Sequence, residues 1–306
     1  MKNMRLGNTD LEVSSIGIGC MRMGGCTVQQ ADAFVKETMD MGVNFFDHAD
    51  IYAGGEAERI FGQVLADNPG LREKMVLQSK AGIVPGVMYD NSKEYLINAV
   101  DGILERLQTE YLDVFLIHRP DALAEPDEVA EAFDELHKAG KVRHFGVSNH
   151  NSMQMELLAS RLSQPLAVDQ LQLSITNSNM IRSGMEVNME TEGACDRDGS
   201  VLDYCRLKNI TIQTWSPFQY GMFEGVFIGS EKYPKLNEVL NRIAAEHSVT
   251  PTTIAAAWIL RHPAKMQLIS GSMKAARQKE ICQATELTLS KKEWYEIYLA
   301  AGHILP

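Results

Sequence analysis

Short apolar segments alternate with amphipathic helical segments along the chain. The apolar segments are rich in β-branched residues and too short for buried helices, which is typical of strands in a parallel sheet. Eight such segments are found, at Ile16–Met21, Val43–Phe46, Met75–Ser79, Leu112–Ile117, Val142–Val147, Leu166–Leu171, Ile210–Thr214 and Gln267–Ile269. Eight strand–helix units predict the α/β fold of a (β/α)8 TIM barrel, and we expect a single domain over residues 1–306.

Helices are predicted between the strands from apolar side chains spaced three and four residues apart and from capping patterns. Thr27 with Gln30, and Ser290 with Glu293, match a capping box, in which two side chains bond the free backbone N–H groups at a helix start. The predicted helices span residues 27–41, 92–107, 127–139, 252–261 and 290–301. They would form the outer layer of the barrel.

The N-terminal residues predict a small β-hairpin. Met4–Leu6 and Leu11–Val13 flank turn residues 7–10, and this hairpin could close the bottom of the barrel. An open, doubly wound sheet is the alternative fold. It is disfavoured because residues 17–22 read G-I-G-C-M-R, so no G-x-G-x-x-G fingerprint follows the first strand.

One long segment, Ser174–Ser200, lacks a clear period and is rich in Asn, Ser and Gly. A loop of that length in a compact domain is often functional. It follows the sixth predicted strand, so we expect it at the carboxyl end of the barrel, where barrel active sites lie. Together with Met21–Met23 and Ile83–Met88, it is predicted to form the walls of a substrate pocket.

Four polar residues near the carboxyl ends of predicted strands can act together. Asp47 and Tyr52 follow the second strand, Lys80 the third and His118 the fourth. Hydride addition to a carbonyl places negative charge on its oxygen, which then needs a proton and a stabilising donor. Tyr52 can supply the proton if Lys80 lowers its pKa toward neutrality, with Asp47 as the counter-ion of Lys80. Each residue alone also fits a structural role, so this hypothesis depends on their convergence.

The same residues resemble the motifs of the aldo-keto reductase superfamily. The resemblance rests on D-x-A-x-x-Y at residues 47–52, on Lys80, on the apolar strand that ends in His118, and on Gly146–Asn149. It extends over nearly the whole chain in order and spacing. It implies an NADPH-dependent oxidoreductase acting on small carbonyl compounds, with Tyr52 as general acid, Lys80 and Asp47 tuning its pKa, and His118 orienting the substrate.

The resemblance also implies a site for the nicotinamide end of a cofactor. Ser148, Asn149 and Gln170 match residues that bond the carboxamide, and Trp215 matches a ring that stacks on the nicotinamide. The full set of expected cofactor residues is Met21, Asp47, Ser148, Asn149, Gln170, Trp215, Ser216, Pro217, Phe218, Gly221, Ser270, Gly271, Ser272, Met273, Lys274 and Arg277.

The segment Ile269–Arg277 resembles the family's phosphate site for the adenosine end of the cofactor. A small-residue loop that opens a helix offers backbone N–H groups and a positive dipole end to an anion. Lys274 and Arg277 add charge, and they favour NADPH over NADH because a 2′-phosphate gives a cation something to pair with.

Some positions depart from the family pattern. Ser270 stands where proline is usual, and Ile281 stands where Asn commonly contacts adenine. Arg119 follows His118 where many members have an aromatic residue. A cation at the pocket wall could attract acidic substrates, so Arg119 is a candidate substrate residue; a structural ion pair with a carboxylate such as Asp121 is an equally good interpretation.

Composition argues against several other classes of protein. The net charge of −11 disfavours a general affinity for nucleic acid. No segment predicts a membrane helix or a signal peptide, so we expect a cytoplasmic protein, either a monomer or a weak homo-oligomer. The five cysteines include no C-x-x-C pattern and no H-E-x-x-H motif occurs, so neither disulfides nor a metal site is predicted.

Two other functions stay open at this point. A cofactor-binding redox sensor or accessory subunit would keep the same fold with little turnover. An unrelated barrel enzyme, such as an aldolase, would use Lys80 as a Schiff-base nucleophile. That chemistry needs a lysine that loses its proton easily, and Asp47 beside Lys80 would have the opposite effect.

Overall fold

The centre of the molecule is a closed barrel of eight parallel strands, seen in the computed structural model, which describes residues 1–305. The strands are β3 (Ile16–Gly19), β4 (Phe45–Asp47), β5 (Val76–Ala81), β8 (Leu112–Ile117), β9 (Val142–Ser148), β10 (Leu166–Gln172), β11 (Thr211–Trp215) and β14 (Gln267–Ser270). Around the barrel each strand lies beside the next one in chain order, and β14 pairs with β3 to close the ring. All eight predicted strands are confirmed, with ends that differ from the prediction by no more than two residues.

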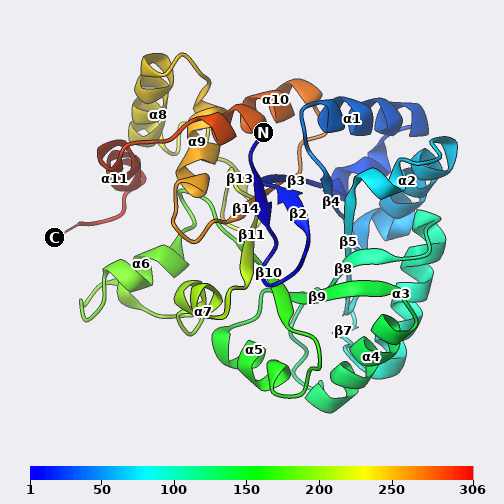
Figure 1. Ribbon diagram of the computed structural model, residues 1–306. Helices are drawn as coiled ribbons and strands as arrows, with labels where there is room; N and C mark the ends of the chain where they lie inside the picture. Colours follow the sequence, from blue (N-terminus) through cyan, green and yellow to red (C-terminus); the bar gives the residue numbers. More distant parts are fainter. Residues whose placement is uncertain (306) are drawn as a thin grey trace.

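Helices surround the barrel as an outer ring (Figure 1). They are α1 (Val28–Asp40), α2 (Glu56–Asp67), α3 (Lys93–Leu107), α4 (Pro126–Lys138), α5 (Ser152–Ala159), α6 (Asn179–Met185), α7 (Val201–Lys208), α8 (Pro234–Glu246), α9 (Pro251–Leu260), α10 (Ala275–Gln283) and α11 (Lys291–Ala300). The five predicted helices correspond to α1, α3, α4, α9 and α11, and both predicted capping boxes are present. The (β/α)8 architecture is therefore confirmed.

An antiparallel hairpin of β1 (Asn3–Arg5) and β2 (Glu12–Ser14) precedes the barrel, as predicted. It is drawn in dark blue in Figure 1, in front of the barrel strands. Leu6 and Val13, at its inner ends, are fully buried and belong to one apolar cluster with Phe45 and Val114 of the barrel interior. Burial of these side chains removes apolar surface from water, so the hairpin closes the N-terminal end of the barrel.

The segment Ser174–Ser200 is more ordered than its sequence suggests. It contains α6 and the short helix η4 (Glu192–Ala194). Arg182 forms an ion pair with Glu186, with 3.2 Å between Nε and Oε1. Within residues 1–305, no helix combines the length and apolar character needed to cross a membrane.

Candidate active site

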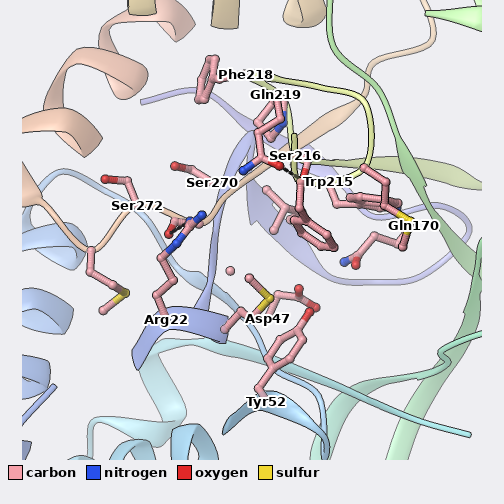
Figure 2. Close-up of a pocket in the computed structure, with 18 of the residues that line it drawn as sticks. Arg22, Asp47, Tyr52, Gln170, Trp215, Ser216, Phe218, Gln219, Ser270 and Ser272 are labelled. Carbon is pink, nitrogen blue, oxygen red and sulfur yellow. Dashed lines mark hydrogen bonds between the residues drawn. The ribbon is translucent and has the colours of Figure 1, made fainter. Parts of the chain in front are cut away.

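A cavity of about 830 Å³ opens at the carboxyl ends of the barrel strands. Asp47, Tyr52 and His118 line one part of it, and Lys274 and Arg277 line another. In Figure 2 the hydroxyl group of Tyr52 lies beside Asp47 and is directed into the cavity, with Trp215 above it. Ligand pockets in proteins commonly enclose about 300–1,000 Å³, so the cavity can hold a cofactor together with a small substrate.

Lys80 and Asp47 form a buried ion pair beneath the cavity. Lys80 Nζ lies 2.6 Å from Asp47 Oδ1 and donates a second hydrogen bond of 2.7 Å to the carbonyl oxygen of His48. Both side chains are almost completely excluded from solvent. Burial alone would lower the pKa of Lys80, but Asp47 and Tyr52 outweigh it and the pKa of Lys80 is raised. Lys80 therefore keeps its charge, which argues against a Schiff-base role.

Tyr52 lies against the Lys80 charge. Lys80 Nζ is 5.1 Å from the centroid of the Tyr52 ring. Burial raises the pKa of Tyr52 to about 12, while the charge of Lys80 acts in the opposite direction. Lys80 thus acts in the expected direction, but the loss of solvation around the phenol has the larger effect. Tyr52 thus holds its proton throughout the neutral range, which suits a proton donor.

His118 completes the predicted group of four. Its ring lies edge-on to that of Tyr52, with 6.1 Å between centroids and 84° between planes. Burial, then the charges of Lys80 and Arg119, lower the pKa of His118 well below its usual range. The imidazole is therefore neutral and can donate only one hydrogen bond. The structure brings all four predicted residues to one place.

A network of buried glutamines supports Asp47 from inside the barrel. Gln78 Nε2 donates to Asp47 Oδ1 over 2.6 Å and to Gln213 Oε1 over 2.8 Å. Gln170 Nε2 also donates to Gln213 Oε1, over 3.0 Å, and Gln213 Nε2 donates to Gln267 Oε1 over 2.8 Å. All four glutamines are buried. The network links the carboxylate of Asp47 to Gln170, whose side chain borders the cavity.

The predicted cofactor residues line the cavity, with the exception of Gly221. Gly221 is instead part of a turn outside the lining, and its carbonyl oxygen accepts a 2.7 Å hydrogen bond from Gln172 Nε2. Its φ of +56° lies in the left-handed region that favours glycine, so Gly221 allows the backbone to turn at this position.

Polar side chains at the Trp215 end of the cavity hold one another in place. Trp215 Nε1 donates to Asn149 Oδ1 over 3.2 Å, and Asn149 Nδ2 donates to Ser148 Oγ over 2.7 Å. Ser148 Oγ in turn donates to the carbonyl oxygen of Gln170 over 2.8 Å. The Gln170 side chain donates into the glutamine network, so its Oε1 atom is left to accept a hydrogen bond from a ligand.

The other end of the cavity has the chemistry of an anion site. The loop from Ser270 to Lys274 leads into α10, and Lys274 and Arg277 border the cavity there. Gln278 Nε2 fixes the loop by donating to the carbonyl oxygen of Ser272 over 2.6 Å. Ser270 Oγ is buried and has no hydrogen-bond partner in residues 1–305. An unsatisfied buried hydroxyl in the same lining as two cations has suitable chemistry for the phosphate groups of a dinucleotide.

Several residues of the cavity were missed by the sequence analysis. Met222, Phe223 and Val226, around the short hairpin of β12 (Gln219–Tyr220) and β13 (Gly225–Val226), form one wall. The ring of Phe223 stacks near Trp215, with 6.2 Å between centroids. The available signal was weak, because Gln219, Gly221, Glu224 and Gly225 interrupt the apolar residues that follow Phe218.

The predicted pocket walls are only partly correct. Met21 and Ile83 do border the cavity, but no residue from Ser174–Ser200 does so within the described part of the chain. That segment packs outside the rim, where Ser174 Oγ donates to the carbonyl oxygen of Gln219 over 2.7 Å. Arg22, which lies within the predicted stretch Met21–Met23, also borders the cavity, and its Nη1 donates to the carbonyl oxygen of Gly271 over 2.8 Å (Figure 2).

Comparison with known proteins agrees with this geometry. The family model described as "Aldo/keto reductase family" matches residues 15–300. The chain belongs to the aldo/keto reductase family. A 6-dehydroglucose reductase of Novosphingobium aromaticivorans is 35% identical, over 99% of this chain and 96% of its own length. The oxidoreductase YdhF of Escherichia coli is 33% identical, over 92% and 90% respectively.

A solved aldo-keto reductase structure has the same fold. The thermostable aldo-keto reductase Tm1743, solved with the inhibitor epalrestat, superposes with a TM-score of 0.77 at 27% identity, covering 98% of this chain and all of its own chain. These relatives make this aldo/keto reductase an oxidoreductase enzyme, as the sequence predicted. Members of the family generally use nicotinamide cofactors, which is consistent with the residues found at both ends of the cavity.

Proposed function

We propose that this enzyme reduces aldehydes or ketones to alcohols with NADPH, using Tyr52 as the general acid. The observation that carries the proposal is the single cavity that joins the Tyr52 hydroxyl, above the Asp47–Lys80 pair, to the cationic segment at Lys274 and Arg277. Turnover of NADPH with a panel of aldehydes and ketones tests it. The panel begins with 6-dehydroglucose, the substrate named for two relatives.

Each of the four residues has its own role in the reaction. NADPH supplies the hydride when it is bound. Tyr52 donates its proton to the carbonyl oxygen as negative charge develops there, and the charge of Lys80 favours this loss of the proton. Lys80 stabilises the phenolate that remains, and Asp47 holds Lys80 in its charged form. Neutral His118 donates a hydrogen bond to the substrate oxygen and orients it.

The glutamine network makes Gln78 a positioning residue for Asp47. Gln78→Met keeps the side-chain volume but removes the 2.6 Å hydrogen bond to Asp47 Oδ1. We expect kcat to fall about threefold to tenfold, with KM for the carbonyl substrate nearly unchanged, because Asp47 then holds Lys80 less firmly. Steady-state kinetics at saturating cofactor measure both constants.

Gln267→Met is the matched control for this prediction. Gln267 belongs to the same buried network, but it contacts Gln213 and does not contact Asp47. We expect it to lower Tm about as much as Gln78→Met while leaving kcat close to wild type. An equal loss of kcat in both variants would mean that the network supports only the fold.

Cofactor preference is predicted to depend on Arg277. Arg277 borders the cavity where α10 begins, and with Lys274 it can pair with a 2′-phosphate group. Arg277→Ala should weaken NADPH binding about tenfold, which is the effect of losing roughly one charge-assisted contact, and should change NADH binding much less. Titration of the tryptophan fluorescence with each cofactor gives both dissociation constants. Equal weakening of the two would reject the 2′-phosphate assignment.

Arg119 is proposed to select substrates with an acidic group. It borders the cavity beside His118, and within residues 1–305 it forms no ion pair. Asp121, the other candidate partner, instead accepts backbone hydrogen bonds from Asn91 and Leu123. An aldehyde that bears a carboxylate should therefore show a kcat/KM about tenfold above that of its methyl ester, and Arg119→Met should remove the difference. A wild-type enzyme with no preference would contradict this role.

A further inference from the structure

The bottom of the barrel holds a second cavity, of about 750 Å³, on the face opposite the candidate active site. Its lining comes from the N-terminal hairpin, from the start of β11, from the loop between α9 and β14, and from η5 (Ala284–Glu286) with the residues after it. We call this the basal cavity. In Figure 1 the N-terminus lies in front of the barrel, on the side of the N-terminal hairpin that lines this cavity.

The basal cavity is lined by cations and by no carboxylate. Its charged residues are Lys2, Arg5, Arg206, Arg261 and Lys265. The whole chain has 40 acidic and 29 basic residues, so the positive charge of this lining is opposite in sign to the net charge of the protein. A concave surface lined by charges of one sign concentrates the field and attracts counter-ions of the opposite sign.

Most of these cations are available to a ligand. Within residues 1–305, only Arg206 among them forms an ion pair, with 3.3 Å between its Nη1 atom and Asp203 Oδ1. The nearby carboxylate of Glu286 forms an ion pair with the N-terminal amine, with 3.1 Å between the amine nitrogen and Oε1. Lys2, Arg5, Arg261 and Lys265 are exposed at the cavity surface and have no carboxylate partner in the described chain.

Two of the arginines are already held in position. Arg261 Nε donates to the carbonyl oxygen of Leu289 over 2.8 Å, and Arg5 Nε donates to the carbonyl oxygen of Thr9. Neither guanidinium makes another side-chain hydrogen bond within residues 1–305, so the terminal nitrogens of both remain free. A guanidinium anchored at Nε loses little further freedom when its terminal nitrogens bind an oxyanion, which favours binding.

We propose that the basal cavity binds a small molecule with a chain of phosphate groups, such as a polyphosphate or a nucleoside triphosphate. Several cations in one lining favour a ligand with several negative charges, and guanidinium groups match phosphate oxygens in geometry. The cavity volume is within the usual range for a ligand of this size. The binding does not compete with the catalytic cavity, because the two lie at opposite ends of the barrel.

A bound polyphosphate also ties separate parts of the chain together. Arg5 is the last residue of β1, whereas Arg261 and Lys265 lie in the loop before β14. Bridging them stabilises the closure of the barrel by the hairpin, so the ligand raises Tm. Because the contacts are partly exposed, the affinity decreases as the salt concentration rises.

Isothermal titration of tripolyphosphate at low ionic strength tests this site directly. We expect saturable binding to the wild type and binding at least tenfold weaker in the double variant Arg5→Gln, Arg261→Gln. The matched control Lys36→Gln, Lys138→Gln removes two exposed cations from the outer helices α1 and α4 and should bind within twofold of wild type. The difference between the two double variants isolates the basal cavity from any binding at Lys274 and Arg277.

Titrations with ATP and with citrate identify the class of ligand. ATP binding more tightly than tripolyphosphate supports a nucleotide, and equal binding supports an inorganic polyphosphate. Citrate binding more tightly than tripolyphosphate would overturn the phosphate assignment. The proposal is also overturned if the wild type shows no saturable binding, or if the Arg5→Gln, Arg261→Gln variant binds as tightly as wild type while its circular dichroism and Tm show it to be folded.

Discussion

Tyr52→Phe is expected to lower kcat for carbonyl reduction by about a thousandfold, within the range that general acid catalysis contributes. The substitution removes one oxygen atom and leaves the ring against the Lys80 ammonium and the His118 ring. Lys80 cannot take over as the proton donor, because it is buried beneath the cavity and is held by Asp47. The steady-state loss of NADPH absorbance with a good aldehyde substrate measures the effect.

Cofactor binding provides the control for Tyr52→Phe. The residues expected to hold the cofactor, from Ser148 to Arg277, remain unchanged, so the dissociation constant for NADPH should stay within about threefold of wild type. A variant that keeps more than a tenth of the wild-type kcat would remove Tyr52 from the role of general acid. A variant that binds NADPH poorly would indicate a structural part for the phenol instead.

Lys80→Met is the other substitution with a large expected effect. It removes the positive charge that stabilises the phenolate of Tyr52, so we expect kcat to fall at least a hundredfold at neutral pH. Because Lys80 lowers the pKa of Tyr52 against the effect of burial, its loss leaves the tyrosine a still weaker acid. KM for the carbonyl substrate should change little. A variant that mainly raised KM would contradict the electrostatic role.

The fold of the Lys80→Met variant needs a separate check, because the substitution leaves the Asp47 carboxylate buried with only Gln78 as a donor. Removing one partner of a buried pair commonly costs about 3–5 kcal/mol. Circular dichroism and Tm show whether the chain still folds at the assay temperature.

Borohydride treatment of the wild type with a carbonyl substrate tests the aldolase alternative. We expect the protein mass to stay unchanged, whereas a covalent adduct at Lys80 would support the aldolase alternative.

The barrel was predictable because its signals are local in sequence. Each buried strand is a continuous apolar run, since parallel strands are covered on both faces. The capping residues Thr27 and Ser290 mark helix starts by a mechanism that involves only neighbouring residues. Among the helices that were not predicted, α5 and α7 have only eight residues each and present too few turns for a 3.6-residue period to be recognised. The longer helices α2 and α8, with 12 and 13 residues, were overlooked although each buries one apolar face.

The site was predictable in its residues but not in its energetics. Strand ends meet at one face of a barrel, so Asp47, Lys80 and His118 could be grouped from the sequence. The pKa of Tyr52 depends on how deeply the phenol is buried, which no linear pattern gives. Gln78 and Gln213 are 135 positions apart and pair only across the closed barrel. Their importance depends on a contact that no spacing rule predicts.

The sequence also failed to predict which segment forms the wall of the cavity. Ser174–Ser200 is irregular in sequence but packs outside the rim, whereas the short hairpin that carries Phe223 forms the wall. Gly and Asn content identifies a loop, but it does not tell which way the loop folds over the barrel. That direction is set by tertiary contacts such as the hydrogen bond from Ser174 Oγ to the backbone of Gln219.

We propose that one cavity brings NADPH and a carbonyl compound together above Tyr52. The most direct test is to titrate the wild-type enzyme with NADPH while following tryptophan fluorescence, and then to add the aldehyde panel to the saturated complex. We predict saturable quenching, because Trp215 borders the cavity, followed by oxidation of NADPH with formation of an equal amount of alcohol. Absence of NADPH binding, or binding without turnover of any carbonyl in the panel, would show that this cavity does not carry out NADPH-dependent carbonyl reduction.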